Sequence, residues 1–153
     1  MKKLKIALIS LCLASTVTLG TASHAYRKIQ PTKAQDIDCL AKNIYHEARS
    51  EPLEGQIAVA QVTLNRVRSS KYPSTVCKVV YAPSQFSWTL DKTKRIRDKR
   101  AWAASVEVAR AVLTQSVRLP DFRAHYYHTP KVRPSWAKNK QIVAVIGNHI
   151  FYS

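Results

Sequence analysis

The chain has 153 residues, with 25 Lys and Arg against 9 Asp and Glu, which gives a formal net charge of +16. This length accommodates one domain with a single hydrophobic core and argues against several domains in tandem. The positive charge favours a polyanionic partner, which could be nucleic acid, an anionic membrane or an anionic cell wall.

The N-terminal segment has the layout of a secretory signal peptide. Three lysines within the first five residues precede an apolar stretch that runs to about Leu19, and Ser23-His24-Ala25 is a small-x-small cleavage pattern. The stretch is short for a membrane anchor, which is the alternative. We expect residues 1–25 to be removed and residues 26–153 to form one exported domain, in the periplasm or at the cell wall. Loss of the three lysines lowers the net charge from +16 to +13, and export favours the wall as the polyanion.

Two cysteines, Cys39 and Cys77, remain after residue 25. An even pair in an oxidising compartment predicts a disulfide. Closing a loop of about 39 residues would stabilise the fold by about 4 kcal/mol in the chain-entropy model. Two buried free thiols are the alternative.

Helical periodicity begins after residue 32. Thr32 and Gln35 have capping-box spacing, and apolar residues from Ile37 to Ala48 recur at i, i+3, i+4 and i+7, which predicts a helix over about 33–48. Pro52 fits the first turn of a second helix, over about 52–68. That segment is apolar nearly all round, so we expect it to be the central buried helix.

The remaining elements are shorter. We expect a helix or strand over 75–81, a loop over 82–94, and a helix from residue 98 to about 115. Residues 125–128 have the composition of a strand, and 141–146 and 149–152 flank Gly147-Asn148 as a hairpin. The predicted fold class is therefore α+β, mainly helical, with a small late β-hairpin.

Glu47 lies about 90° from the centre of the apolar face of its predicted helix, by 3.6-residue geometry. This position predicts a half-buried carboxyl group, which would hold its proton as a general acid must. From position alone, a surface ion pair at the helix end is the favoured alternative.

Polar and aromatic side chains could line a substrate groove. Gln61 and Asn65, at i and i+4 of the apolar second helix, could face such a groove or bond the backbone of a neighbouring loop. The late aromatic residues could stack on sugar rings, although core packing is their usual role, and we expect about two of the five to line a groove. These aromatic residues are Phe86, Trp88, Tyr126, Tyr127 and Trp136.

We expect neither a metal site nor a cofactor. His46-Glu47 begins a His-Glu-x-x-His zinc motif, but Ser50 stands where the second histidine is required. Strand spacing places His125 and His128 on opposite faces, which disfavours a shared metal. The basic run at 92–100 could be a solvated face or a polyanion contact.

The run from Ile44 to Val67, which contains Glu47-Ala48-Arg49-Ser50-Glu51-Pro52, resembles the signature of the spore cortex-lytic cell-wall hydrolase family (SleB/CwlJ type). Matches continue in order through 75–81, 85–89, 125–128 and 146–152, so the likeness extends from about residue 38 to the C-terminus. Ser50 departs from the glycine that is usual in this motif.

The resemblance implies a lysozyme-like domain that cleaves the β-1,4 bond between N-acetylmuramic acid and N-acetylglucosamine in peptidoglycan. It implies that Glu47 is the catalytic acid, which reverses the preference drawn from position alone. We expect a monomer that binds glycan strands, with no nucleic acid partner and no stable membrane insertion. The expected substrate-binding residues are Gln61, Asn65, Phe86, Ser87, Tyr126, Tyr127 and His128.

Glycoside hydrolysis ordinarily uses two carboxyl groups, and no acid besides Glu47 stands in a convincing context, since Glu51 and Glu54 fit a role in charging a helix N-terminus. One carboxyl group suffices for a lytic transglycosylase, which leaves 1,6-anhydro-muramic ends. A hydrolytic muramidase or glucosaminidase and a zinc amidase are alternatives. A non-catalytic basic protein that binds wall or nucleic acid is the alternative from a different class.

Overall fold

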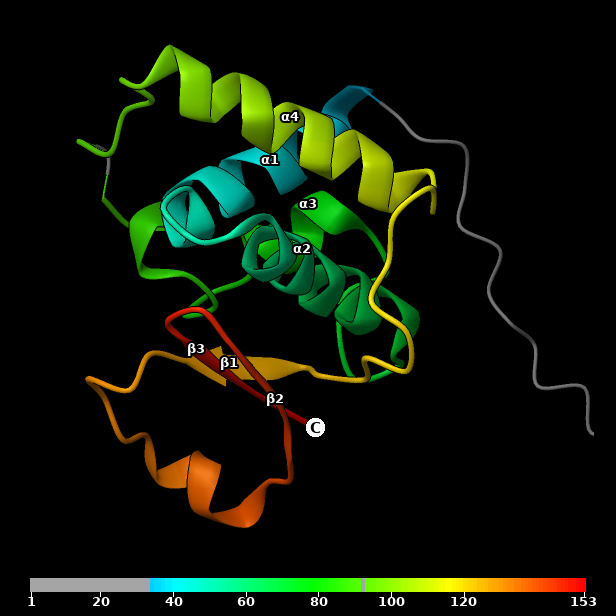
Figure 1. Cartoon of the computed structure of the whole chain (residues 1–153), viewed down its shortest axis with the longest axis vertical. Coiled ribbons are helices and arrows are strands. Elements are labelled where there is room, and N and C mark those ends of the chain that lie inside the picture. The colour runs from blue at the N-terminus through cyan, green and yellow to red at the C-terminus, as the bar shows by residue number, and fades with distance from the viewer. Residues whose placement is uncertain (1–33, 92) are drawn as a thin grey trace, which may run out of the picture.

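The computed structural model describes residues 34–91 and 93–153, and it arranges them as a helical layer above a small sheet (Figure 1). The predicted signal peptide, residues 1–25, lies outside the described residues. No helix within the described ranges is long and apolar enough to span a membrane. The elements in chain order are α1 (Ala34–Ala48), α2 (Leu53–Arg68), α3 (Val76–Val80), the 3-10 turn η1 (Ser87–Thr89), α4 (Lys99–Leu113), β1 (Tyr126–His128), the 3-10 segment η2 (Ser135–Asn139), β2 (Ile142–Ile146) and β3 (His149–Tyr152).

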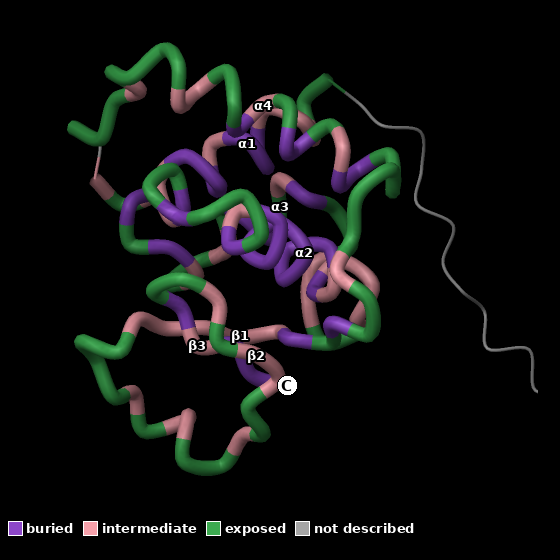
Figure 2. The backbone as a smooth tube through the Cα atoms, in the orientation of Figure 1, coloured by how far each residue is buried: buried purple, intermediate pink, exposed green. Residues whose placement is uncertain are grey.

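The helical layer confirms the predicted long helices. α1 packs against α2, α3 and α4, and α2 is the most buried helix, as its all-round apolar sequence predicted (Figure 2). Pro52 is the N-cap of α2 and not its first residue. The open choice at 75–81 resolves as a helix, because the Thr75 side chain accepts a hydrogen bond from the backbone N–H of Lys78.

A disulfide joins Cys39 of α1 to Cys77 of α3, with their Cα atoms 5.3 Å apart. The predicted pairing is therefore present in the structure. It ties the short α3 to the first helix at the edge of the main core.

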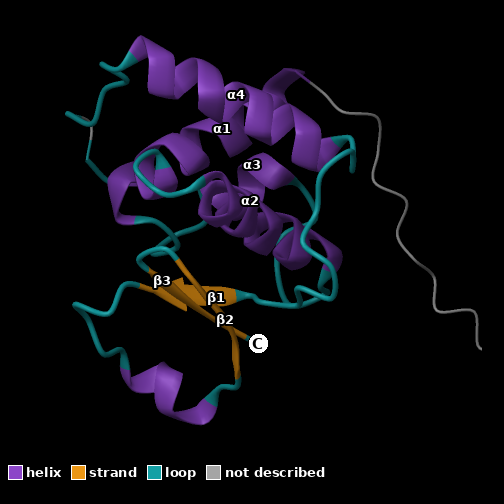
Figure 3. Cartoon of the chain, in the orientation of Figure 1, coloured by secondary structure: helices purple, strands orange, loops and turns teal. Residues whose placement is uncertain are grey.

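The three strands form one antiparallel sheet in the order β1-β3-β2, below the helices (Figure 3). β2 and β3 are the predicted hairpin, and β1 pairs with β3 through Tyr127 opposite Phe151. The turn residue Gly147 has φ +55°, and a Cβ there would collide with the carboxylate of Glu51. The fold class expected from the sequence is confirmed.

The two faces of the sheet pack against different partners. On the inner face, Phe151 is fully buried against α1, α2 and Phe122. On the outer face, Trp136 from η2 contacts the rings of Tyr126, His128 and Tyr152. Successive side chains of a strand point to opposite faces, so neighbours in sequence on β1 enter different clusters.

Candidate active site

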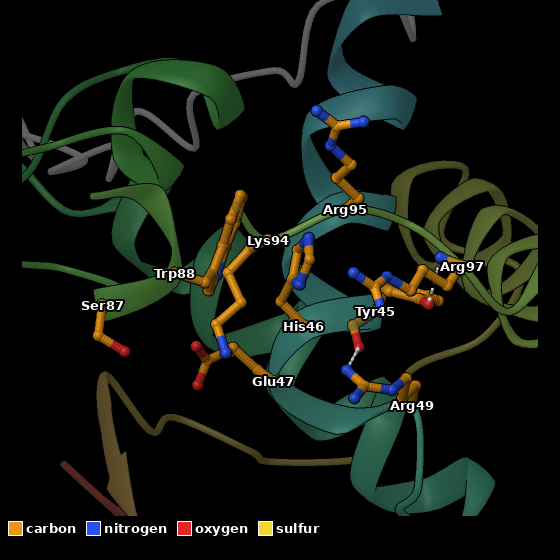
Figure 4. Close-up of a pocket in the computed structure, with 9 residues that line it drawn as sticks. All are labelled: Tyr45, His46, Glu47, Arg49, Ser87, Trp88, Lys94, Arg95 and Arg97. Atoms are coloured by element: carbon orange, nitrogen blue, oxygen red, sulfur yellow. Dashed lines mark hydrogen bonds between the residues drawn. The ribbon is translucent and has the colours of Figure 1, made fainter. Parts of the chain in front are cut away.

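A pocket of about 280 Å³ opens beside Glu47. Its walls come from the last turn of α1, from η1 and from the basic loop that precedes α4 (Figure 4). The lining residues are Tyr45, His46, Glu47, Arg49, Ser87, Trp88, Lys94, Arg95 and Arg97. Glu47 is the only acidic residue among these described lining residues, so the pocket combines one carboxyl group with several cations.

The environment of Glu47 favours its protonated form. The side chain is half-buried in the last turn of α1, and burial raises the pKa of its carboxyl group above the ordinary value of 4.5. The hydroxyl of Tyr127 donates a hydrogen bond of 3.2 Å to Oε2, and this bond and the charge of Arg66 oppose part of the rise in pKa. The result is a carboxyl group held in place and inclined to keep its proton.

Tyr127 reaches Glu47 from the inner face of the sheet. Burial raises the pKa of its phenol well above 10, and the neighbouring charge of Glu47 raises it further. Tyr127 therefore stays protonated and remains a hydrogen-bond donor to Glu47. Its ring is held edge-on by His149 and at a tilt by Phe151.

Arg66 supplies a buried positive charge behind this pair. Its side chain is 6% exposed, its Nε donates to the carbonyl of His125 at 2.7 Å, and its guanidinium lies 5.6 Å from the ring centres of both Tyr72 and Phe86. No ion-pair partner of Arg66 occurs among residues 34–91 and 93–153. Its charge remains available to stabilise Glu47 when the carboxyl group is ionised.

Three predicted groove residues contact other parts of the protein and do not line this pocket. Phe86 is 4% exposed and belongs to the main hydrophobic core. The amide of Asn65 donates to the carbonyls of Phe122 and Ala124 at 2.9 and 3.0 Å. Gln61 accepts from the N–H of Leu119 and donates to its carbonyl. The loop-bonding alternative describes the two amides, because they donate to the backbone carbonyls of Leu119, Phe122 and Ala124.

Strand alternation separates the other predicted residues. Tyr127 contacts Glu47 and Ser87 lines the pocket, whereas Tyr126 and His128 lie on the outer face of the sheet with Trp136. His128 is held there by the hydroxyl of Tyr152 and the carbonyl of Thr129. Tyr126 and His128 therefore do not line this pocket, and a role in binding substrate stays a prediction for all four residues.

Tyr45 and His46 also line the pocket and were missed by the sequence reasoning. The ring of His46 stacks on Trp88 at 4.5 Å, and burial lowers the pKa of the imidazole, with the nearby cations Arg49 and Lys94 lowering it further. His46 is therefore neutral near pH 7. The basic run at 92–100 was the signal that could have identified the basic side of this pocket, because the sequence left a polyanion contact open there.

Glu51 does not serve a helix N-terminus as expected but joins the α1–α2 turn to the β2–β3 hairpin. Its carboxylate accepts from the backbone N–H of Asn148 at 2.8 Å and from the Asn148 amide at 3.1 Å. Burial raises the pKa of Glu51, but these two hydrogen bonds outweigh it and the pKa is lowered overall. Glu51 is thus an ionised, 9% exposed group that holds the hairpin turn against the helices.

The histidines are distributed over separate contacts. His125 stacks on Tyr72, and His149 lies with Nδ1 4.0 Å from Glu51. Burial lowers the pKa of His149, so the imidazole is neutral near pH 7. Within the described ranges, no three His, Cys, Asp or Glu side chains gather as a metal-ligand set.

Comparison with known proteins places this geometry in a family. Curated relatives include spore cortex-lytic enzymes from Oceanobacillus iheyensis, 35% identical over 119 residues that cover 76% of this chain and 41% of that protein, and from Bacillus subtilis, 34% identical with 76% and 37% covered. The chain thus spans about two fifths of the length of these relatives.

Two solved structures are similar at 31% identity. The catalytic domain of the Bacillus cereus SleB protein matches with a TM-score of 0.65, over 82% of this chain and 95% of that one. The catalytic domain of the germination-specific lytic transglycosylase SleB from Bacillus anthracis matches with a TM-score of 0.66, over 81% and 98%. The model of the Cell Wall Hydrolase family matches residues 50–152, beginning three residues after Glu47. The chain belongs to the cell wall hydrolase family.

Proposed function

We propose that this protein cleaves the glycan strands of peptidoglycan at the β-1,4 bond between N-acetylmuramic acid and N-acetylglucosamine, as a lytic transglycosylase. The observation that carries the proposal is the half-buried carboxyl group of Glu47, whose pKa is raised by burial. Among the described residues that line its pocket, no other is acidic. The family, and the lytic transglycosylase activity of the Bacillus anthracis relative, support it.

In the proposed mechanism, Glu47 acts first as acid and then as base. Its proton passes to the glycosidic oxygen as the bond from that oxygen to the anomeric carbon of the muramic sugar breaks. The carboxylate then takes the proton of the muramic 6-hydroxyl, whose oxygen bonds to the same anomeric carbon. The product is a 1,6-anhydro end, Glu47 regains its proton, and no water is consumed.

Tyr127 and Arg66 fit both halves of this cycle. Because Oε2 accepts the hydrogen bond from Tyr127, the acidic proton of Glu47 is carried on Oε1. Once Glu47 is ionised, the same hydrogen bond and the charge of Arg66 stabilise the carboxylate. Tyr127 and Arg66 therefore reduce the free-energy cost of ionising Glu47, while burial still favours the protonated form before the reaction begins.

The hydrolytic alternative requires a second carboxyl group, about 5–5.5 Å away in retaining enzymes or about 6.5–9.5 Å in inverting ones. Glu51, the nearest acid in sequence, is committed to Asn148 of the hairpin. This commitment favours the intramolecular route, in which the sugar's own hydroxyl replaces water.

The test is digestion of purified sacculi with the wild type, Glu47→Gln and Glu54→Gln, followed by mass spectrometry of the muropeptides. Wild type and Glu54→Gln, which changes an exposed carboxyl group of α2, should release products with anhydro ends, lighter by one water than reducing ends. Glu47→Gln should be slower by about a hundredfold or more, the usual contribution of a general acid. Reducing ends would refute the transglycosylase route.

The same digestion judges the remaining alternatives. Unchanged lysis by Glu47→Gln would reject Glu47 as the catalytic acid, and no lysis by any form would favour a basic protein that only binds the wall. Loss of activity with a chelator would favour a zinc amidase, whereas we expect lysis to persist. Export is part of the proposal, and N-terminal sequencing of the secreted protein should find Tyr26 as the first residue.

A further inference from the structure

Four cationic side chains line the pocket beside Glu47. Arg49 directly follows α1, and Lys94, Arg95 and Arg97 come from the loop before α4. All four are exposed, and none forms an ion pair within residues 34–91 and 93–153. We call these four side chains the cationic wall of the pocket, and their positive charge is available to a ligand.

The cationic wall is fixed to the helical layer. The buried hydroxyl of Tyr45 accepts hydrogen bonds from the backbone N–H groups of Arg97 and Asp98, at 3.1 and 3.0 Å. The guanidinium of Arg49 lies 5.0 Å from the centre of the Tyr45 ring and donates to the Tyr45 carbonyl at 3.1 Å. One tyrosine thus anchors both segments that carry the cations.

The pocket has a flat side as well as a charged side. The stacked rings of His46 and Trp88 form the flat side. In Figure 4 the Lys94 side chain extends in the direction of the Glu47 carboxyl group. Arg49 and Arg97 lie beside Tyr45. A ligand that suits this arrangement presents a carboxylate to the cations within reach of the carboxyl group that would cleave the glycan.

We propose that this wall binds a free carboxylate of the stem peptide carried by the muramic sugar under cleavage, so that the protein selects peptide-bearing, anionic glycan strands. The proposal rests on the proposed function. The stem peptide is attached through the lactyl group to the same sugar ring whose anomeric bond Glu47 would break, so a pocket that adjoins Glu47 is where the peptide begins. The arginines and the lysine then act as specificity residues.

The test compares two soluble glycan oligomers of equal length, one with free stem-peptide carboxylates and one with those carboxylates converted to amides. The wild type should cleave the free form with a kcat/KM about fivefold higher, a modest factor because solvent-exposed ion pairs are weak. Lys94→Gln/Arg97→Gln should lose this preference, so that its kcat/KM values for the two oligomers lie within about twofold of each other. Lys131→Gln/Lys138→Gln, which removes two exposed charges outside the pocket lining, should keep the preference.

Equal cleavage of both oligomers by the wild type, or an equal loss on both oligomers in the pocket variant, would overturn the proposal. Fluorescence anisotropy with Glu47→Gln protein and labelled versions of the two oligomers separates this failure from that of the proposed function. If the wild type cleaves neither oligomer, the proposed function fails, and tighter binding of the free-carboxylate form still supports the wall's selectivity. Equal binding of the two forms rejects it.

Discussion

The two faces of the three-stranded sheet carry similar residues and serve different purposes. The inner face presents Tyr127 and Phe151 to the helices and to Glu47, while the outer face presents Tyr126 and Tyr152 to Trp136 of η2. Composition does not distinguish the faces, since both are aromatic. The difference is set by the alternation of the strand and by which layer covers each face, so position on the pleat decides which tyrosine meets the acid.

Removal of a large side chain from each face tests how much each face contributes to stability. Phe151→Ala should lower the free energy of unfolding by about 3–5 kcal/mol, the usual cost of deleting a buried aromatic ring. Trp136→Ala should cost less, about 1–2 kcal/mol, because Trp136 is only half-buried. Urea unfolding followed by circular dichroism measures both values, and equal costs would mean that the outer cluster is as much a core as the inner one.

Replacing Glu51, which contacts the β2–β3 hairpin, tests how the inner face of the sheet is held on the helices. Glu51→Gln should lower the free energy of unfolding by about 2 kcal/mol at pH 7, since it weakens hydrogen bonds to a buried charged group. The pKa of Glu51 is lowered in the folded protein, so its stabilising effect is present above its ordinary value of 4.5 and is lost as pH falls through the folded value.

The pH dependence provides the control for Glu51→Gln. The wild type and the variant should differ in stability at pH 7 and converge below pH 4.5 in thermal unfolding. Glu54→Gln, with an exposed carboxyl group, should follow the wild type at all pH values. A difference between wild type and Glu51→Gln that is independent of pH would assign the effect to packing instead of charge.

The sequence predicted the parts of this molecule that depend on local pattern. The long helices, the hairpin at Gly147-Asn148 and the half-buried position of Glu47 follow from periodicity and turn chemistry, and the structure has them. The pattern could not say which face of a three-residue strand would turn inward, because Tyr126, Tyr127 and His128 are all compatible with burial. It also could not show that Glu51 and Gln61 bond segments 97 and 58 residues away in sequence.

The sharpest test of the two faces compares adjacent tyrosines of β1. Tyr127→Phe should lower kcat about tenfold, since it removes a hydrogen bond to a group that becomes charged in the proposed cycle. The bond from Tyr127 lowers the pKa of Glu47, so its loss should raise that pKa further and shift the alkaline limb of the pH–rate profile, where the general acid loses its proton, to higher pH.

Tyr126→Phe removes the same atom from the outer face and is the matched control. Its kcat should stay within about twofold of the wild type, and its pH–rate profile should not move, because Tyr126 contacts Trp136 and Lys140 and not Glu47. A shift of the alkaline limb in Tyr127→Phe alone would show that the tyrosine acts through the ionisation of Glu47, since a loss of packing would lower activity without moving the profile. Equal effects from both substitutions would mean that β1 supports the site only as a scaffold.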